Sequence, residues 1–189
     1  MAKVVLFLMF ASNIVISYIQ SAHIDNGPIF YINGKQVIGN PLVLNDFPEL
    51  SNETLSEDTE YPSKIIVSKN GETYMMLCQY EGNAQNVYSL IMIGYVSNLK
   101  TQGYDYPKTT IEHFDLENGI KLGDNYKHII DIQGHPHELY KNADTTITKY
   151  VYTEDKYPIL KGYNMPPYFM RFRFISDVLD EITFGFEYP

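Results

Sequence analysis

The sequence contains no tryptophan and only one cysteine, Cys78, among its 189 residues. A single cysteine cannot form a disulfide within the chain, so apolar burial must stabilise the fold. With 44% hydrophobic and 20% charged residues, the composition is typical of one globular domain of ordinary size. Cys78 ends the apolar run Tyr74-Met75-Met76-Leu77-Cys78, where we interpret it as a core residue, with a nucleophile as the alternative.

Positive charge is also scarce. The chain has 14 Lys and Arg against 23 Asp and Glu, which gives a formal net charge of -9. Because proteins contact phosphates through Lys and Arg, we expect no nucleic-acid partner, and an anionic membrane surface is disfavoured. A basic protein partner is favoured instead, although solubility alone is an alternative explanation of the acidic charge.

Long apolar stretches are absent except at the start of the chain. In residues 1–22, Lys3 precedes an apolar stretch that ends in small residues at Ser21 and Ala22. This layout is typical of a secretory signal peptide, and the stretch is shorter than the roughly 20 residues that a membrane span needs. We therefore predict one mature α+β domain over residues 23–189, a periplasmic or secreted location and no stable membrane span. An uncleaved anchor or a buried first element is the alternative.

Tyrosine and phenylalanine are abundant, with 17 and 10 residues, and turn signals recur along the chain. Asn33-Gly34 and Asn70-Gly71 each separate two apolar segments, which is the strongest short-range signal of a β-hairpin. Strands are predicted over residues 29–32, 36–38, 64–68, 73–80, 87–96, 110–114, 146–152, 167–174 and 178–188.

The last two predicted strands alternate between apolar and polar residues. Met170, Phe172 and Phe174 alternate with Arg171 and Arg173. In the final strand, one face is expected to carry Ile182, Phe184, Phe186 and Tyr188, and the other Thr183, Gly185 and Glu187. This period of two predicts a sheet with one covered and one exposed face. The fold class is therefore α+β, mostly β: an antiparallel sheet with one or two short helices packed on one face.

A helix is predicted over residues 125–133. Asp124 is placed to cap its first turn, because its carboxylate can accept hydrogen bonds from the exposed backbone amides there. Ile129, Ile130 and Ile132 give the helix an apolar side. Gly134 is expected to end it in a left-handed conformation, with Pro136 shortly after.

This segment carries a resemblance to a known family. Gly123, Ile129, Gly134 and Pro136 match the spacing of the core signature of the SmpA/OmlA and β-lactamase-inhibitor-protein-like superfamily. The segment over about residues 110–189 resembles the helix-then-antiparallel-strands unit of that superfamily. Residues 23–108 show no second copy of the motif, unlike the tandem inhibitor proteins.

The resemblance implies a bacterial envelope or secreted protein that acts as an inhibitor, an immunity protein or a scaffold. We therefore predict an exported binding protein, specifically an immunity or inhibitor protein that neutralises an envelope-targeted toxin or hydrolase. A periplasmic envelope scaffold or assembly factor is the alternative. The sequence carries none of the common catalytic motifs, and we predict no enzyme, no catalytic residue and no cofactor.

Tyrosines and carboxylates of the second half are the candidate partner-binding residues, because aromatic side chains supply much of the binding energy at protein interfaces. A regular strand places Tyr150 and Tyr152 on one face, and core packing is the alternative interpretation. The predicted partner-binding residues are Tyr150, Tyr152, Tyr163, Glu181 and Glu187.

Histidines and a carboxylate cluster around the predicted helix. His128 and Asp131 are three residues apart, and His135 and His137 follow. This spacing is compatible with a metal site. We interpret the four as surface polar residues and predict no metal.

Overall fold

The computed structural model describes residues 27–51, 53, 55, 60–99 and 105–188. The predicted signal peptide lies outside these residues. The strands are β1 (Tyr31–Ile32), β2 (Lys35–Gln36), β3 (Ser63–Val67), β4 (Thr73–Cys78), β5 (Leu90–Tyr95), β6 (Glu138–Asn142), β7 (Thr145–Tyr152), β8 (Tyr168–Ile175) and β9 (Val178–Phe186). The helices are α2 (Val43–Asp46) and α3 (Tyr126–Gln133), with 3-10 turns η1 (Pro48–Leu50), η2 (Val96–Asn98) and η3 (Pro158–Tyr163).

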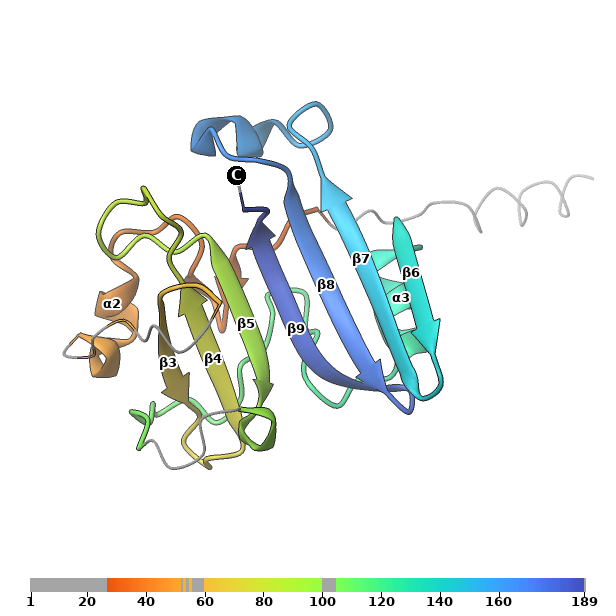
Figure 1. The fold of residues 1–189 in the computed structure, drawn as a ribbon, viewed down its shortest axis with the longest axis horizontal. Coiled ribbons are helices and arrows are strands. Elements are labelled where there is room, and N and C mark those ends of the chain that lie inside the picture. Colours follow the sequence, from red (N-terminus) through yellow and green to blue (C-terminus); the bar gives the residue numbers. More distant parts are fainter. Residues whose placement is uncertain (1–26, 52, 54, 56–59, 100–104, 189) are drawn as a thin grey trace, which may run out of the picture.

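One antiparallel sheet of seven strands dominates the structure (Figure 1). Its strand order is β3-β4-β5-β9-β8-β7-β6, and β1 and β2 form a separate two-stranded sheet. The last strand, β9, lies in the middle, where it joins the β3–β5 strands to the β6–β8 strands. The prediction of an α+β, mostly β fold with an antiparallel sheet and few short helices is confirmed.

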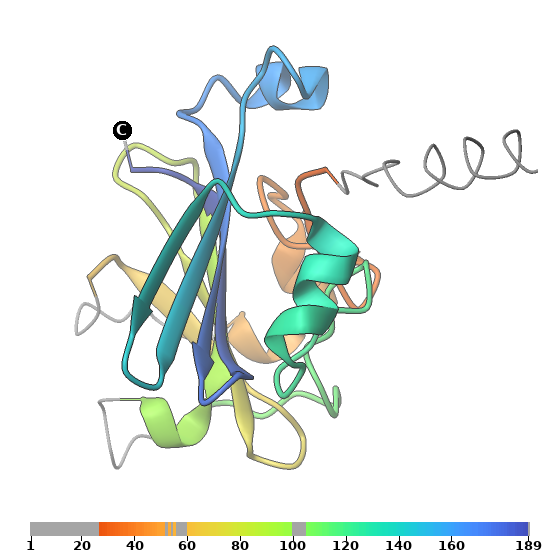
Figure 2. The ribbon, with the colours of Figure 1, turned by 90° about the vertical axis from the view of Figure 1, so that its right-hand side faces the viewer.

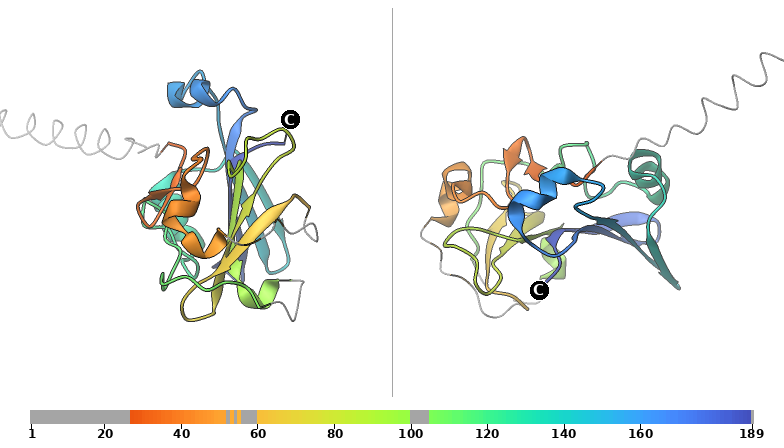
Figure 3. Two further views of the ribbon diagram at one scale, coloured as in Figure 1. Left: turned by 90° about the vertical axis from the view of Figure 1, so that its left-hand side faces the viewer. Right: turned by 90° about the horizontal axis from the view of Figure 1, so that it is seen from above.

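The helices and the N-terminal segment cover one face of the sheet. Figure 2 and the left view of Figure 3 show α2, α3 and the segment from residue 27 on the same side of the strands. Met170, Phe172 and Phe174 of β8 point into this core and are fully buried. Ile182, Phe184 and Phe186 of β9 do the same, so the predicted alternation of these two strands is confirmed.

Both predicted Asn-Gly hairpins are present. Asn33 and Gly34 have positive φ angles of 50° and 74°, which is the geometry of a tight hairpin turn between β1 and β2. Gly71, with φ of 80°, lies in the turn between β3 and β4, and its N–H donates to the carbonyl of Ser68 at 2.9 Å. Turn chemistry that the sequence displays therefore sets the register of both hairpins.

Helix α3 begins one residue later than predicted. Its cap is Asn125, whose Oδ1 accepts a hydrogen bond from the backbone N–H of His128 at 2.9 Å. The prediction that Asp124 caps the helix is wrong, because its carboxylate instead accepts from the N–H of Lys121 at 2.9 Å. Ile129 is fully buried, and Gly134 ends the helix as expected. The predicted left-handed conformation of Gly134 is wrong, because its φ is positive but its ψ is extended.

Two strand predictions need correction. Residues 110–114 form no strand, and their neighbourhood is joined to β3 only by an isolated bridge between Val67 and Lys108. Strand β6 was not predicted, because all five of its residues are exposed and show no alternating apolar pattern. Pairing with β7 alone holds β6 at the edge of the sheet.

The conformation of Gly134 leads to a stability prediction. Its φ of 79° and ψ of -163° lie in a region that is open almost only to glycine. We expect Gly134→Val to lower the free energy of unfolding by about 1 kcal/mol or more. Denaturant unfolding measures the change, and Gly162→Val is the matched control, because the space around Gly162 is open and its φ is not positive. Equal effects of the two substitutions would contradict the prediction.

Candidate binding groove

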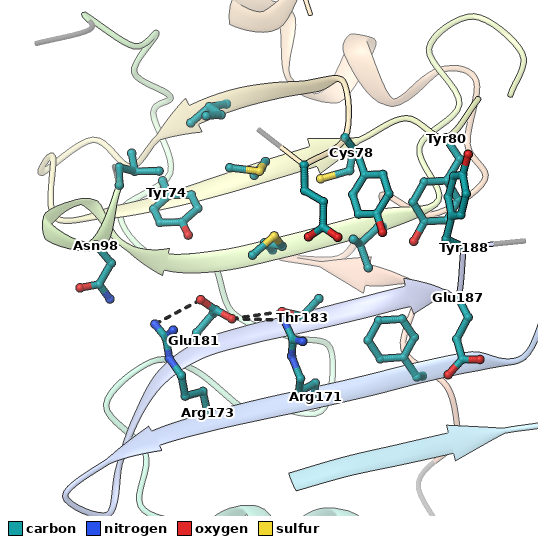
Figure 4. A pocket seen from close by; sticks show the side chains of 18 of the residues that line it. Tyr74, Cys78, Tyr80, Asn98, Arg171, Arg173, Glu181, Thr183, Glu187 and Tyr188 are labelled. Carbon is teal, nitrogen blue, oxygen red and sulfur yellow. Dashed lines mark hydrogen bonds and ion pairs between the residues drawn. The ribbon is translucent and has the colours of Figure 1, made fainter. Parts of the chain in front are cut away.

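A groove of about 650 Å³ lies on the sheet face that the helices leave open. Figure 4 shows its side chains rising from β4, β5, β8 and β9. The lining residues are Glu60, Tyr61, Ile65, Tyr74, Met76, Cys78, Tyr80, Leu90, Met92, Asn98, Leu99, Lys149, Phe169, Arg171, Arg173, Glu181, Thr183, Glu187 and Tyr188. This volume is in the range of known ligand-binding clefts, roughly 300–1,000 Å³.

The β3–β5 side of the groove is apolar. On these strands the side chains that point away from the core, such as those of Ile65, Met76 and Leu90, are also buried, in a second apolar cluster. Every residue of β3 and β4 is buried, so these strands are covered on both faces. The prediction of one covered and one exposed face therefore holds for β8, whose alternate residues are half-buried, but not for β3 and β4. On β9 it is wrong at Thr183 and Gly185, which are buried although they lie on the groove side.

The β8–β9 side of the groove is charged. The guanidinium of Arg173 contacts Asp180 at 2.6 Å and Glu181 at 3.1 Å. Arg171 lies 3.5 Å from Glu181 and donates a hydrogen bond to the Thr183 hydroxyl at 3.2 Å. These are cross-strand pairs between β8 and β9, in which opposite charges face each other on neighbouring strands.

A second ion pair continues this charged side onto β7. The Lys149 ammonium contacts Glu187 at 2.7 Å and lies 5.5 Å from the centre of the Phe169 ring. The hydrogen bond with Glu187 raises the pKa of Lys149. Lys149 therefore stays protonated and keeps a positive charge beside an aromatic face.

Three tyrosines close one end of the groove. The rings of Tyr61, Tyr80 and Tyr188 lie with their centroids 5.0 to 5.5 Å apart. The Tyr80 hydroxyl donates to the carbonyl of Phe186 at 2.7 Å, and burial raises its pKa. Tyr188 is half exposed, at 50%. Strand β9 ends at Phe186, so Tyr188 departs from the alternation and joins the groove rather than the core.

Cys78 lies beneath the groove with only 1% of its surface exposed. Burial raises the pKa of its thiol to about 12. Since the thiolate is the nucleophilic form, Cys78 carries almost no nucleophile at neutral pH. The residue packs as a small apolar side chain among Ile65, Met76 and Leu90.

This burial predicts slow alkylation. At pH 8 we expect iodoacetamide to modify Cys78 in the folded protein at least about a hundredfold more slowly than in the urea-unfolded chain. Intact mass spectrometry follows the reaction at this one site, since the sequence has no other cysteine. Similar rates in the folded and unfolded protein would show that the thiol is accessible.

The predicted partner-binding residues divide between the two faces. Tyr150 and Tyr152 are each 2% exposed and belong to the core, so the expectation that they form an exposed aromatic patch is wrong. Their strand is regular as assumed, but the face that they share is the one beneath the helices. The Tyr150 hydroxyl donates to the carbonyl of Gly134 and fixes the end of α3 on the sheet.

Tyr163 is half-buried on the helix side. Its ring stacks on Phe30, with centroids 5.5 Å apart, and packs against Phe186 at 5.1 Å. Glu181 and Glu187 both line the groove. Of the five predicted residues, the structure therefore brings only these two carboxylates together at one candidate site. Phe169, Met92 and Tyr188 were missed, because alternation alone does not distinguish a groove from an ordinary surface.

The residues of the histidine cluster have separate contacts. His128 lies 3.8 Å from Asp124, and Asp131 pairs with Lys127 at 2.6 Å. His137 accepts a hydrogen bond from the N–H of Val151 at 3.2 Å. Across residues 27–51, 53, 55, 60–99 and 105–188, no three His, Cys, Asp or Glu side chains converge as a metal site would require.

No protein-family model, curated protein or solved structure matches the chain. Within the described part of the chain, no helix combines the length and apolar character needed to cross a membrane. Evidence on what the groove binds therefore comes from its own side chains and from the short motif around α3.

Proposed function

We propose that this chain is an exported binding protein that neutralises an envelope-targeted toxin or hydrolase, and that the groove is the surface that contacts it. The observation that carries the proposal is the composition of the groove: an apolar and aromatic floor bordered by half-exposed ion pairs. An apolar centre within a polar rim is the usual anatomy of a protein–protein interface, and Tyr and Arg are enriched at such surfaces.

The motif around α3 supports the same proposal. Gly123 and Gly134, two of the four matching residues, both have positive φ angles, at 91° and 79°. Helix α3 is followed by four antiparallel strands, β6 to β9, and this is the arrangement that the resemblance to the inhibitor-protein superfamily implies. Members of that superfamily act by binding, which is consistent with a groove built from packing residues and ion pairs.

Net charge supports a basic partner. At -9, the chain attracts positively charged proteins over distances of about 10 Å at moderate ionic strength. We therefore expect the association rate with the partner to fall as salt rises, while the dissociation rate changes little.

A substitution at the centre of the groove tests the proposal. Met92 is half-buried on β5 and lines the groove. We expect Met92→Arg to weaken binding to the partner by about tenfold or more, because it places an unpaired charge in the apolar part of the interface. The partner is captured with the tagged chain from the envelope and culture-fluid fractions of the native host, and affinities are compared by surface plasmon resonance.

Leu139→Arg is the matched control. Leu139 is 49% exposed on β6 and lies on the same strand face as Lys141, two residues later. The Lys141 ammonium lies 5.2 Å from the centre of the Tyr126 ring of α3, so both side chains are on the helix side. Capture unaffected by Met92→Arg but lost with Leu139→Arg would refute the groove as the interface. A captured protein whose enzymatic or toxic activity is unchanged in the complex would favour the envelope-scaffold alternative.

A further inference from the structure

Three cations line the charged side of the groove, and they differ in how well they are paired. Lys149 and Arg173 each have a carboxylate oxygen within 2.7 Å. Among the described carboxylates, the oxygen nearest to Arg171 belongs to Glu181 and lies 3.5 Å away, and that carboxylate also contacts Arg173 at 3.1 Å. Arg171 is also the most exposed of the three, with 42% of its side chain accessible against 27% and 32%.

The surroundings hold the guanidinium of Arg171 beside the groove floor. One of its nitrogens donates to Thr183, which fixes the head on the open face of β9 (Figure 4). Phe169 is two residues earlier on β8 and on the same face, so the two residues are about 7 Å apart along the strand. A guanidinium has five N–H donors, and Arg171 uses one of them in this contact. Arg171 and the apolar residues Met76, Leu90 and Met92 line the same groove.

We propose that the groove receives a segment of the partner protein in which a large apolar side chain lies next to a carboxylate, and that Arg171 binds this carboxylate. That the partner is a protein rests on the proposed function. The inference adds that the inserted segment carries an apolar side chain and a carboxylate. The apolar side chain packs on the floor formed by Met76, Leu90 and Met92. The carboxylate accepts paired hydrogen bonds from the guanidinium, the geometry in which arginine binds carboxylates best.

The charge pattern favours this occupant. Although the chain has a net charge of -9, the described lining of the groove balances its three glutamates, Glu60, Glu181 and Glu187, with three cations, Lys149, Arg171 and Arg173. Two of them are neutralised locally, and the third is left with only a shared carboxylate. The overall negative charge of the chain thus attracts a basic partner, while a single acidic group on the inserted segment fixes the position of that segment along the groove.

Two small probes that differ in one charge test the inference. N-acetylphenylalanine presents an aromatic ring beside a carboxylate, and its amide derivative is the uncharged counterpart. Each is titrated at pH 7 into the protein expressed from its full coding sequence, and binding is followed by ¹H–¹⁵N NMR. We expect the carboxylate to bind about tenfold more tightly than the amide and to shift the resonances of Arg171, Phe169 and Met92.

Variants of two cations complete the test. We expect Arg171→Gln to abolish the preference for the carboxylate, and Arg171→Lys to reduce it, because an ammonium lacks the planar fork. Lys127→Gln is the matched control, since Lys127 is 82% exposed in its pair with Asp131 on α3. It should leave the preference unchanged. The comparison of the two probes on the unsubstituted protein remains decisive even when an Arg171 variant fails to fold.

The outcomes separate this inference from the proposed function. Equal binding of both probes overturns the role of Arg171, while capture of a partner that depends on Met92 still stands. Laurate that binds more than about a hundredfold more tightly than N-acetylphenylalanine would identify a free amphipathic carboxylate as the occupant and overturn a protein segment. A partner whose affinity is insensitive to Arg171→Gln also overturns the inference.

Discussion

Gly185→Ala is expected to destabilise the protein by about 3 kcal/mol or more, enough to prevent folding of a marginally stable domain. Gly185 lies in β9, opposite Leu90 of β5, with φ of 146°. A Cβ atom there would overlap the carbonyl oxygen of Ser89 and lie 2.8 Å from the Cα of Leu90. Both atoms belong to backbone, which cannot move aside as a flexible side chain does.

The next residue, Phe186, holds the backbone of Gly185 close to that of Ser89. The N–H of Phe186 donates to the same Ser89 carbonyl at 2.8 Å, so relieving the overlap breaks a hydrogen bond that joins β9 to the start of β5. Denaturant unfolding of purified protein measures the loss. Gly162→Ala, at a position where nothing lies within 4 Å, is the control and should change stability by less than about 1 kcal/mol. A stable Gly185→Ala variant would refute this strand junction.

The sequence predicted which face is buried for β8 and β9, but not for β3 and β4. In β8 and β9, arginines and acidic residues alternate with aromatic ones, and this alternation identifies the buried face directly. In β3 and β4 the apolar residues are continuous, because both faces are covered. Such a run predicts a strand but says nothing about which face is the core. The sequence therefore did not predict which of these apolar side chains form the groove floor.

The candidate site was predicted only in its charged part. Glu181 and Glu187 were identified because strand alternation placed them away from the core, and the structure puts both on the groove. Tyr150 and Tyr152 share a face by the same alternation, but their strand gives no sign of which face the helices cover. Their position followed only from the pairing of Tyr150 with Met170 and Tyr152 with Tyr168 on β8. Which face of a strand is buried thus depends on tertiary packing, and the sequence of one strand does not determine it.

The buried thiol and tyrosine hydroxyls of this fold predict a sharp loss of stability at alkaline pH. Burial raises the pKa of the Cys78 thiol from its ordinary 9.0 to about 12, and the pKa of Tyr74 and Tyr88 from 10.0 to about 12. All three side chains are at most 4% exposed, so solvent does little to screen these shifts.

The direction of the effect follows from which state releases its protons first. From pH 9 upward the unfolded chain ionises at these three groups, while the folded protein holds its protons until about pH 12. Deprotonation therefore favours the unfolded chain, and the free energy of unfolding falls as pH rises through this window. At pH 11 the combined loss is about 5 kcal/mol, since each unit of pKa difference corresponds to about 1.4 kcal/mol.

The thiol and the tyrosines are separable, because they titrate in different parts of this window. Near pH 10 we expect Cys78 to account for about 1 kcal/mol, more than Tyr74 and Tyr88 together. Cys78→Ala should therefore remove more than half of the fall between pH 8 and 10, and less than half of the fall between pH 10 and 11, where the two tyrosines contribute more. Urea unfolding at each pH in the presence of a reductant, with tyrosinate absorbance recorded in parallel, tests both parts. A free energy of unfolding that stays constant up to pH 11 would mean that water reaches these side chains in the folded protein.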